Sequence, residues 1–191
     1  IRAFSEILRG DGLSDSERAH YAGIILDESR RLTRLLDDLL DISVLESGQV
    51  VLNPAPTNLV QVIDRAVVAS GVVDLQFRRN RVSEDVPLHT DADRLAQVFI
   101  NLITNAAKYC DAADPALRIV VGGTGNTVSV DFIDNGAGIP PADRTLIFEK
   151  FTRLTDHAAA GSAGLGLAIC RNIVEAHEGS IRADHSELGG L

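Results

Sequence analysis

The sequence predicts an α+β fold in which an antiparallel helical hairpin is followed by a two-layer α/β sandwich. The first observation is a short helical pattern at 1–9, which a turn at 10–15 separates from a long helical pattern at about 16–46. The second is that helical and strand-like patterns alternate after residue 49. The third is the stretch 53–56, whose prolines suit a hinge between the two parts.

The helical part, residues 1–48, is expected to form half of a dimeric four-helix bundle. Its long helix begins next to Ser14 or Asp15, either of which is a suitable N-cap, and ends at Ser47 and Gly48. Small and apolar residues form a wide stripe along it: Ala22, Ile25, Ser29, Leu32, Leu36 and Leu39, broadened by Leu26, Leu35, Leu40, Ile42 and Leu45. This stripe is wider than a two-stranded seam and favours a bundle made by two hairpins.

The second part, residues 49–191, is expected to be the α/β sandwich. Helices are predicted near 59–70, 91–110 and 165–177, and strands near 50–52, 75–79, 117–121, 128–133 and 180–183.

Composition and charge narrow the function classes. The net charge of −9 and the pI of about 4.9 argue against nucleic-acid binding, which requires a basic footprint. Cys110 and Cys170 lie in helical patterns without metal-ligand spacing and are expected to be reduced core thiols. The sequence has no signal peptide and no apolar run of membrane-spanning length, so the fragment is expected to be soluble and cytoplasmic.

A polar stripe marks the helix predicted at 91–110. Apolar residues from Leu95 to Ala106 define its buried face, and the other side carries Gln97, Asn101, Asn105 and Lys108. Asparagine is a poor helix former, so two of them in one helix indicate a use beyond solubility. An amide oxygen suits Mg²⁺ and a lysine suits a phosphate; the alternative is a solvated polar face without a ligand.

The segment DNGAGI, Asp134 to Ile139, follows a strand-like stretch. Asn-Gly after a strand commonly forms a hairpin turn, and this alternative stays open. Against it, alternation does not resume afterwards, and Pro140 and Pro141 do not suit a central strand. A carboxylate at a strand end can instead accept a hydrogen bond from an exocyclic amine, in which case Asp134 would recognise adenine.

Three glycines, Gly161, Gly164 and Gly166, stand directly before the apolar helical run 167–176. Glycines at a helix start leave backbone N–H groups free for phosphate oxygens. Their spacing fits neither a Walker P-loop nor the dinucleotide fingerprint. Upstream, Lys150 and Arg153 can reach outward while phenylalanines anchor the segment, and the Ala-, Gly- and Ser-rich stretch around 155–163 is expected to be a lid.

In this order, these segments resemble the N, G1, F and G2 boxes of the ATP-binding domain of bacterial two-component sensor histidine kinases, the GHKL type with the Bergerat fold. The resemblance implies ATP and Mg²⁺ as cofactors. It implies that Asn105 ligates Mg²⁺, that Asn101 supports the metal and phosphates, and that Asp134 binds the adenine amine. It further assigns catalytic roles to Asn101, Lys108 and Arg153, and nucleotide contacts to Tyr109, Gly136, Gly138, Ile139, Lys150, Phe151, Gly164, Leu165, Gly166 and Leu167. Ser162 and Ala163 depart from the family pattern, which leaves lid contacts open.

The resemblance implies transfer of the γ-phosphoryl group of ATP to a histidine, and onward to an aspartate of a response regulator receiver domain. It implies a homodimer through the hairpin, a parent protein that can be membrane-anchored, and a catalytic domain whose last strand is truncated here. The family's H-E/D-x-x-T-P motif does not occur around any of the five histidines, so the acceptor is expected outside this fragment. The alternatives are a GHKL ATPase, a serine-directed kinase of related fold, and a non-catalytic nucleotide-binding dimerisation module.

Overall fold

The structure, a computed structural model, describes residues 2–10, 12–26, 28–29, 32, 52–80, 85–152 and 164–186, with Arg79 described as backbone alone. Several predictions lie outside these residues: the helix end at Ser47 and Gly48, Arg153, the lid around 155–163 with Gly161, Ser162 and Ala163, and the chain end at 189–191. The chain divides into two compact units, Ile1–Glu46 and Ser47–Leu191. The domain limits given above, 1–48 and 49–191, stay a prediction.

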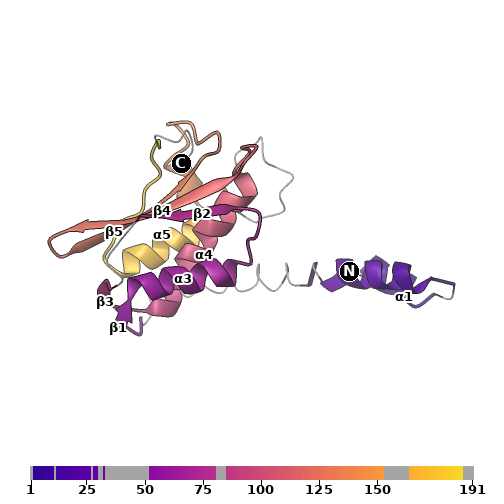
Figure 1. Cartoon of the computed structure of the whole chain (residues 1–191). Coiled ribbons are helices and arrows are strands. Elements are labelled where there is room, and N and C mark those ends of the chain that lie inside the picture. Colours follow the sequence, from indigo (N-terminus) through magenta and orange to yellow (C-terminus); the bar gives the residue numbers. More distant parts are fainter. Residues whose placement is uncertain are drawn as a thin grey trace. The chain divides into compact units, whose positions relative to one another are not determined.

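The first unit contains an antiparallel helical hairpin. Helix α1 spans Arg2–Leu8, and the next helix begins at Asp15 (Figure 1). The rings of Phe4 and Tyr21 stack at 5.9 Å between centroids, and Arg18 donates to the carbonyl of Leu8 at 3.5 Å. These contacts across the turn confirm the predicted hairpin.

Ser14 is the N-cap of the second helix of this hairpin. Its hydroxyl accepts from the N–H of Glu17 at 3.3 Å, and the Glu17 carboxylate accepts from the Ser14 hydroxyl at 2.7 Å and from its N–H at 2.9 Å. This is a reciprocal capping box. The side-chain and backbone hydrogen bonds from Ser14 lower the pKa of Glu17. The choice between Ser14 and Asp15 is thereby decided for Ser14.

The second unit contains two small sheets. Strand β1, Ala55–Asn58, pairs antiparallel with β3, Pro87–Thr90. In the other sheet β4, Ala116–Thr124, lies between β2, Gln76–Arg79, on its parallel side, and β5, Thr127–Asp134, on its antiparallel side. The strands predicted near 75–79, 117–121 and 128–133 are therefore confirmed.

Helices cover one face of the three-stranded sheet (Figure 1). Helix α4, Ala92–Tyr109, packs between α3, Leu59–Ser70, and α5, Gly166–Ala176, and a short 3-10 helix, η1, spans Leu146–Phe148. The three predicted helices are confirmed. Among the described residues, no helix has both the length and the apolar character that a membrane span requires.

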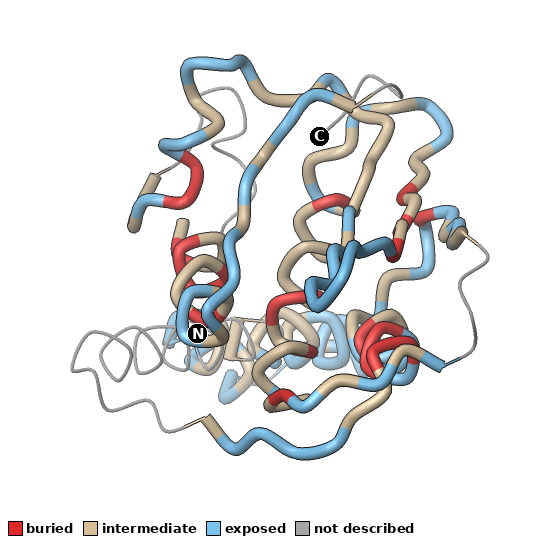
Figure 2. The backbone as a smooth tube through the Cα atoms, turned by 90° about the vertical axis from the view of Figure 1, so that its left-hand side faces the viewer, coloured by how far each residue is buried: buried red, intermediate tan, exposed pale blue. Residues whose placement is uncertain are grey.

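The core of the second unit lies between the helices and the sheet. Alternate residues of β4, Leu117, Ile119 and Val121, are buried, and the rings of Phe99 in α4 and Phe132 in β5 lie 5.3 Å apart. Figure 2 shows buried stretches recurring along the helices. Burying the apolar side chains of both layers stabilises the arrangement. This packing fixes α4, and with it the polar stripe, relative to the sheet.

Two expectations about strands differ from the structure. The segment 53–56 was expected to be a hinge, yet β1 begins at Ala55 and includes Pro56, which an edge strand of a two-stranded sheet tolerates. The strand predicted near 180–183 is wrong, because this segment is irregular; beyond it Asp184 accepts from Arg144 and from the N–H of His185. Of the strand predicted near 50–52, the structure describes only residue 52, which is not in a strand.

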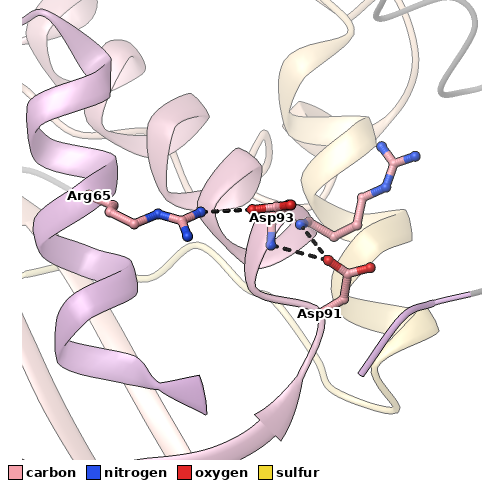
Figure 3. Close-up of polar contacts among 4 residues, drawn as sticks. Arg65, Asp91 and Asp93 are labelled. Carbon is pink, nitrogen blue, oxygen red and sulfur yellow. Dashed lines mark hydrogen bonds and ion pairs between the residues drawn. The ribbon is translucent and has the colours of Figure 1, made fainter. Parts of the chain in front are cut away.

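Asp91 caps α4 and joins it to the start of the second unit. One carboxylate oxygen accepts from the N–H groups of Asp93 and Arg94, each at 3.1 Å (Figure 3). The other oxygen accepts from the N–H of Asn53 at 3.1 Å. Partial burial raises the pKa of Asp91, but these three N–H groups, with a smaller contribution from the charge of His177, lower it overall.

Asp91→Ala is expected to lower the free energy of unfolding by about 1–2 kcal/mol at neutral pH, because α4 loses its cap. Because folding lowers the pKa of Asp91, the stabilisation that its carboxylate provides increases with pH. The stabilisation from the carboxylate is present above the ordinary aspartate pKa of about 3.9 and is lost as the pH falls through the lower folded value. Urea unfolding of both proteins at neutral and strongly acidic pH measures this, and the difference should shrink in acid.

Asp93→Ala is the matched control, since Asp93 is the next acidic residue. Its side chain is 90% exposed and pairs with Arg65 at 2.8 Å (Figure 3), and an exposed pair of this kind contributes about 0–1 kcal/mol. Equal losses in the two variants would contradict the capping role of Asp91.

Candidate nucleotide site

The polar stripe of α4 lies on a helix that is anchored by its buried side. Val98, Phe99, Ile103 and Ala106 are buried. Asn101 and Asn105 are half-buried, whereas Lys108 is exposed, and its ammonium lies 5.2 Å from the ring centroid of Tyr109. The asparagines are therefore held at the margin of the core. In this position an amide oxygen can reach a ligand without leaving the helix.

Asn101 brings the stripe to the start of α5. Its side-chain nitrogen lies 3.5 Å from the carbonyl of Gly166, the first residue of α5, and a Cβ added to Gly166 would lie 3.8 Å from the Asn101 side chain. Leu165 is the N-cap, is buried, and makes no side-chain capping bond. The first N–H groups of a helix have no partner within it, so this start of α5 suits an anion.

Gly164 joins the segment before α5 to the segment after η1. It has a φ of +71°, its carbonyl accepts from the N–H of Phe151 at 2.9 Å, and an added Cβ would lie 2.7 Å from the carbonyl oxygen of Thr152. Only glycine fits both the dihedral angle and the close approach. Phe151 has a φ of +62° and a 64% exposed side chain, and Lys150 is half-buried. The structure thus brings Phe151 and Gly164 together.

Asp134 ends β5 on the side of the sheet that faces the helices, opposite the buried Leu117. It is half-buried, and its Oδ1 accepts from the N–H of Gly136 at 2.9 Å. Residues 135–145 contain no strand, so the hairpin-turn alternative for Asn-Gly is wrong. Gly138 has a φ of +75°. The strand therefore ends in a turn that holds one oxygen of the Asp134 carboxylate.

This turn lies directly beside the C-terminal end of α4. A Cβ added to Gly136 would lie 3.2 Å from the Cα of Cys110, the residue that follows α4. Asn101 and Cys110 are separated along the helix by roughly 14 Å at 1.5 Å per residue. Asn101 meets the start of α5, and the C-terminal end of α4 meets the turn that follows Asp134, an arrangement that suits an elongated ligand with an anionic end.

Asn135 and Asp111 are residues that the sequence did not single out. The side chain of Asn135 binds three groups of the segment 110–116, and Asp111 accepts from the N–H of Ala137 at 3.0 Å. The sequence did contain a signal for Asn135, because this residue is part of the motif DNG. Its partners come before it in the chain by about twenty residues, so the pattern alone did not reveal them.

The cysteines and His177 make contacts within the fold. Cys170 is a buried free thiol, as predicted. Cys110 is free but only half-buried, so the prediction of a core thiol is wrong for this residue; its thiol donates to the Asn135 side chain at 3.2 Å. His177 ends α5 and its Nδ1 lies 2.8 Å from the carbonyl of Ile173, so it is a hydrogen-bonding residue at the helix end.

Residues 90–191 match the family described as "Histidine kinase-, DNA gyrase B-, and HSP90-like ATPase", and residues 1–48 match "His Kinase A (phospho-acceptor) domain". The chain is 37% identical over 168 residues to the signal transduction histidine-protein kinase BaeS of Escherichia coli (strain K12), covering 84% of this chain and 35% of BaeS. The chain spans 21–40% of the length of the first curated relatives it matches.

Two solved structures are similar. The mycobacterial sensor histidine kinase MprB matches with a TM-score of 0.63 and 28% identity, covering 69% of this chain and 86% of MprB. Full-length ShkA in complex with AMPPNP matches with a TM-score of 0.70 and 25% identity, covering 92% of this chain and 37% of ShkA. Both structures therefore share the fold of most of this chain, at 25% identity or more.

Proposed function

The chain belongs to the sensor histidine kinases, within the histidine kinase-, DNA gyrase B- and HSP90-like ATPases, and from this premise we propose that its second unit binds Mg²⁺-ATP for phosphoryl transfer to a histidine. Family membership supports ATP as the nucleotide. The magnesium ion, the individual site residues and the acceptor belong to the proposal. The observation that carries it is the meeting of Asn101 with Gly166, because it places the amide stripe of α4 at the open start of α5.

The residues fit a magnesium nucleotide by their chemistry. Asn105 offers a hard amide oxygen that would ligate Mg²⁺, an ion that prefers oxygen ligands. The first N–H groups of α5 and the Lys108 ammonium suit the phosphates. Asp134, before the turn that meets the C-terminal end of α4, offers an acceptor to the adenine amine, and Tyr109 is proposed to pack near the adenine. ShkA, a structural relative, was solved with AMPPNP, which supports a nucleotide in this fold.

Local cations are needed because the chain as a whole repels a nucleotide. The net charge is −9, whereas a triphosphate is itself strongly anionic. Lys108 and Arg153 would contact the phosphates and help to offset the charge that phosphoryl transfer places on the γ-phosphate oxygens, and bound Mg²⁺ would supply further positive charge there. Asn101 positions the metal and phosphates. The protein's contribution to the reaction is then orientation and charge stabilisation, and the nucleophile is an imidazole.

The first unit suits a role in dimerisation. Ile7, Leu26 and Leu32 are 42%, 50% and 45% exposed, which a bundle with a second hairpin would reduce. We propose a homodimer through this unit and a response regulator receiver domain as the partner that takes the phosphoryl group. A gyrase- or chaperone-like ATPase is not favoured, because residues 1–48 match the phosphoacceptor domain of histidine kinases.

Binding of a fluorescent ATP analogue to the whole chain is expected to weaken when Mg²⁺ is chelated. Asn105→Ala is expected to bind with the same affinity with and without Mg²⁺, because the protein ligand to the metal is gone. Titration of both proteins with and without a chelator measures this.

Gln97→Ala is the matched control for this titration, since it removes an amide from the same helix two turns earlier. It should keep the full magnesium dependence. If Asn105→Ala also keeps it, Asn105 is not the metal ligand.

A further inference from the structure

We propose that Asn135 is a positioning residue for base selection: its side chain clamps the segment that follows α4 and so fixes the turn that orients Asp134. This inference rests on the proposed role of Asp134 in binding adenine. In this proposal Asn135 does not contact the nucleotide. It acts through the backbone on either side of it.

The clamp uses both ends of the Asn135 amide. Its oxygen accepts from the N–H of Ala116 at 2.8 Å and from the thiol of Cys110 at 3.2 Å, and its nitrogen donates to the carbonyl of Asp114 at 3.0 Å. These groups lie at the end of α4, in the following loop and at the first residue of β4. One side chain thus joins the helix end, the loop and the sheet.

The neighbouring residues bring the turn against the same loop. The N–H of Ala137 donates to Asp111 at 3.0 Å, and Gly136 lies so close to Cys110 that an added Cβ would be 3.2 Å from its Cα. The turn is therefore held by contacts on both sides of Gly136. Loss of the Asn135 amide removes the bonds on one side and leaves the N–H of Ala116 without this partner.

The turn sets the orientation of the Asp134 carboxylate. Pairing with Leu117 places the backbone of Asp134, but a strand pairing does not choose the side-chain rotamer. The N–H of Gly136 holds Oδ1 at 2.9 Å, and a Cβ at Gly136 would lie 3.2 Å from the same oxygen. A displaced Gly136 would therefore weaken this hold on Oδ1 and change how the carboxylate is oriented.

Orientation decides the discrimination between bases. Adenine presents an amine where guanine presents a carbonyl oxygen, so a fixed carboxylate accepts from adenine and opposes guanine. A carboxylate that can turn away loses part of its bond to adenine and also part of its rejection of guanine. A loosened turn therefore lowers the preference for ATP over GTP more than it lowers nucleotide binding in general.

Asn80, which directly follows β2, provides a matched control because its side chain also binds the backbone of β4. Its side chain makes a similar clamp, donating to the carbonyl of Val121 at 3.0 Å and accepting from the N–H of Val121 at 3.0 Å. Val121 lies further along β4 from Ala116 and Asp134. Asn80→Ala therefore removes an equivalent pair of backbone bonds without touching the turn at 135–137.

The experiment compares Asn135→Ala, Asn80→Ala and the unsubstituted chain. The affinities for ATP and GTP are measured by competition against a fluorescent ATP analogue, and thermal unfolding is measured in parallel. Both variants should unfold at lower temperature. The ratio of ATP to GTP affinity should fall about tenfold in Asn135→Ala alone. An unchanged ratio in Asn135→Ala, or an equal fall in both variants, overturns the proposal.

A second pair covers the case in which Asn135→Ala does not fold. Asp111→Ala removes the acceptor for Ala137, whereas Asp111→Asn keeps an oxygen there; a lower ratio in the first than in the second supports the clamp, and equal ratios oppose it. A different result would contradict the proposed function on which this inference rests. If the unsubstituted chain itself binds ATP and GTP equally, the role of Asp134 is wrong before Asn135 is tested.

Discussion

Asp134→Asn is expected to lower the affinity for ATP about tenfold or more, since an unpaired buried polar group costs roughly 1–3 kcal/mol. The N–H of Gly136 holds Oδ1 of Asp134 at 2.9 Å, and this bond dictates how the amide will lie. The amide oxygen will turn to the N–H, so its NH₂ group faces the ligand. A donor then meets the adenine amine, which is also a donor. Competition with ATP and GTP on both proteins measures the change.

The loss should be selective for adenine. GTP presents a carbonyl to the new NH₂ group, so its affinity should be kept or improved. Asp131→Asn is the control, because Asp131 is an exposed residue of the same strand whose partner in β4, Val120, alternates with the buried positions. It should leave both affinities unchanged. Equal loss of ATP and GTP in Asp134→Asn would mean that Asp134 acts structurally.

The helices of the second unit could be predicted because their signals are local. The apolar face of α4 repeats every three or four residues, and Asp91 caps it through its own backbone neighbours Asp93 and Arg94. In α3, Asn58 accepts from Val60, and Gly71 follows the helix with a φ of +64°. Periodicity and caps of this kind are contained in one stretch of sequence.

The two-stranded sheet of β1 and β3 could not be predicted, because each of its strands is stabilised by pairing with the other and has little strand signal in its own sequence. β1 and β3 are short, contain Pro56 and Pro87, and pair across about thirty residues of chain. Proline lowers the local strand signal, although an edge accepts it. The segment 180–183 shows the reverse error. This segment has the sequence pattern of a strand but is irregular in the structure. A strand also needs a neighbouring strand to pair with, and the sequence pattern does not show whether one is present.

The site was predictable as a set of motifs but not as a geometry. The sequence placed Asn101, Gly164 and Gly166 among the candidates, and the structure adds that Asn101 meets Gly166 while Gly164 meets Phe151. It could not reveal the clamp of Asn135. An asparagine side chain has several possible backbone partners, and only the folded sheet decides which of them it binds.

The chain alone is not expected to become phosphorylated on histidine, although it should bind ATP. In-line transfer needs an imidazole placed against the γ-phosphate. His20 and His185 are exposed and His89 lies in β3, none of them in the family's acceptor motif; His157 lies outside the described residues. His177 has Nδ1 at 2.8 Å from the Ile173 carbonyl and a buried Nε2, so neither nitrogen is available for attack while α5 is intact.

Incubation of the chain with γ-labelled ATP and Mg²⁺ should therefore give no acid-labile, base-stable label. A longer protein that contains the H-E/D-x-x-T-P segment should become labelled when this chain is supplied as the only nucleotide-binding partner, because the missing component is the nucleophile and not the nucleotide site. Asp134→Asn in the supplied chain should reduce that label along with ATP affinity. Efficient labelling of the chain alone that His177→Gln abolishes would contradict both the structural role of His177 and the proposed need for an external acceptor.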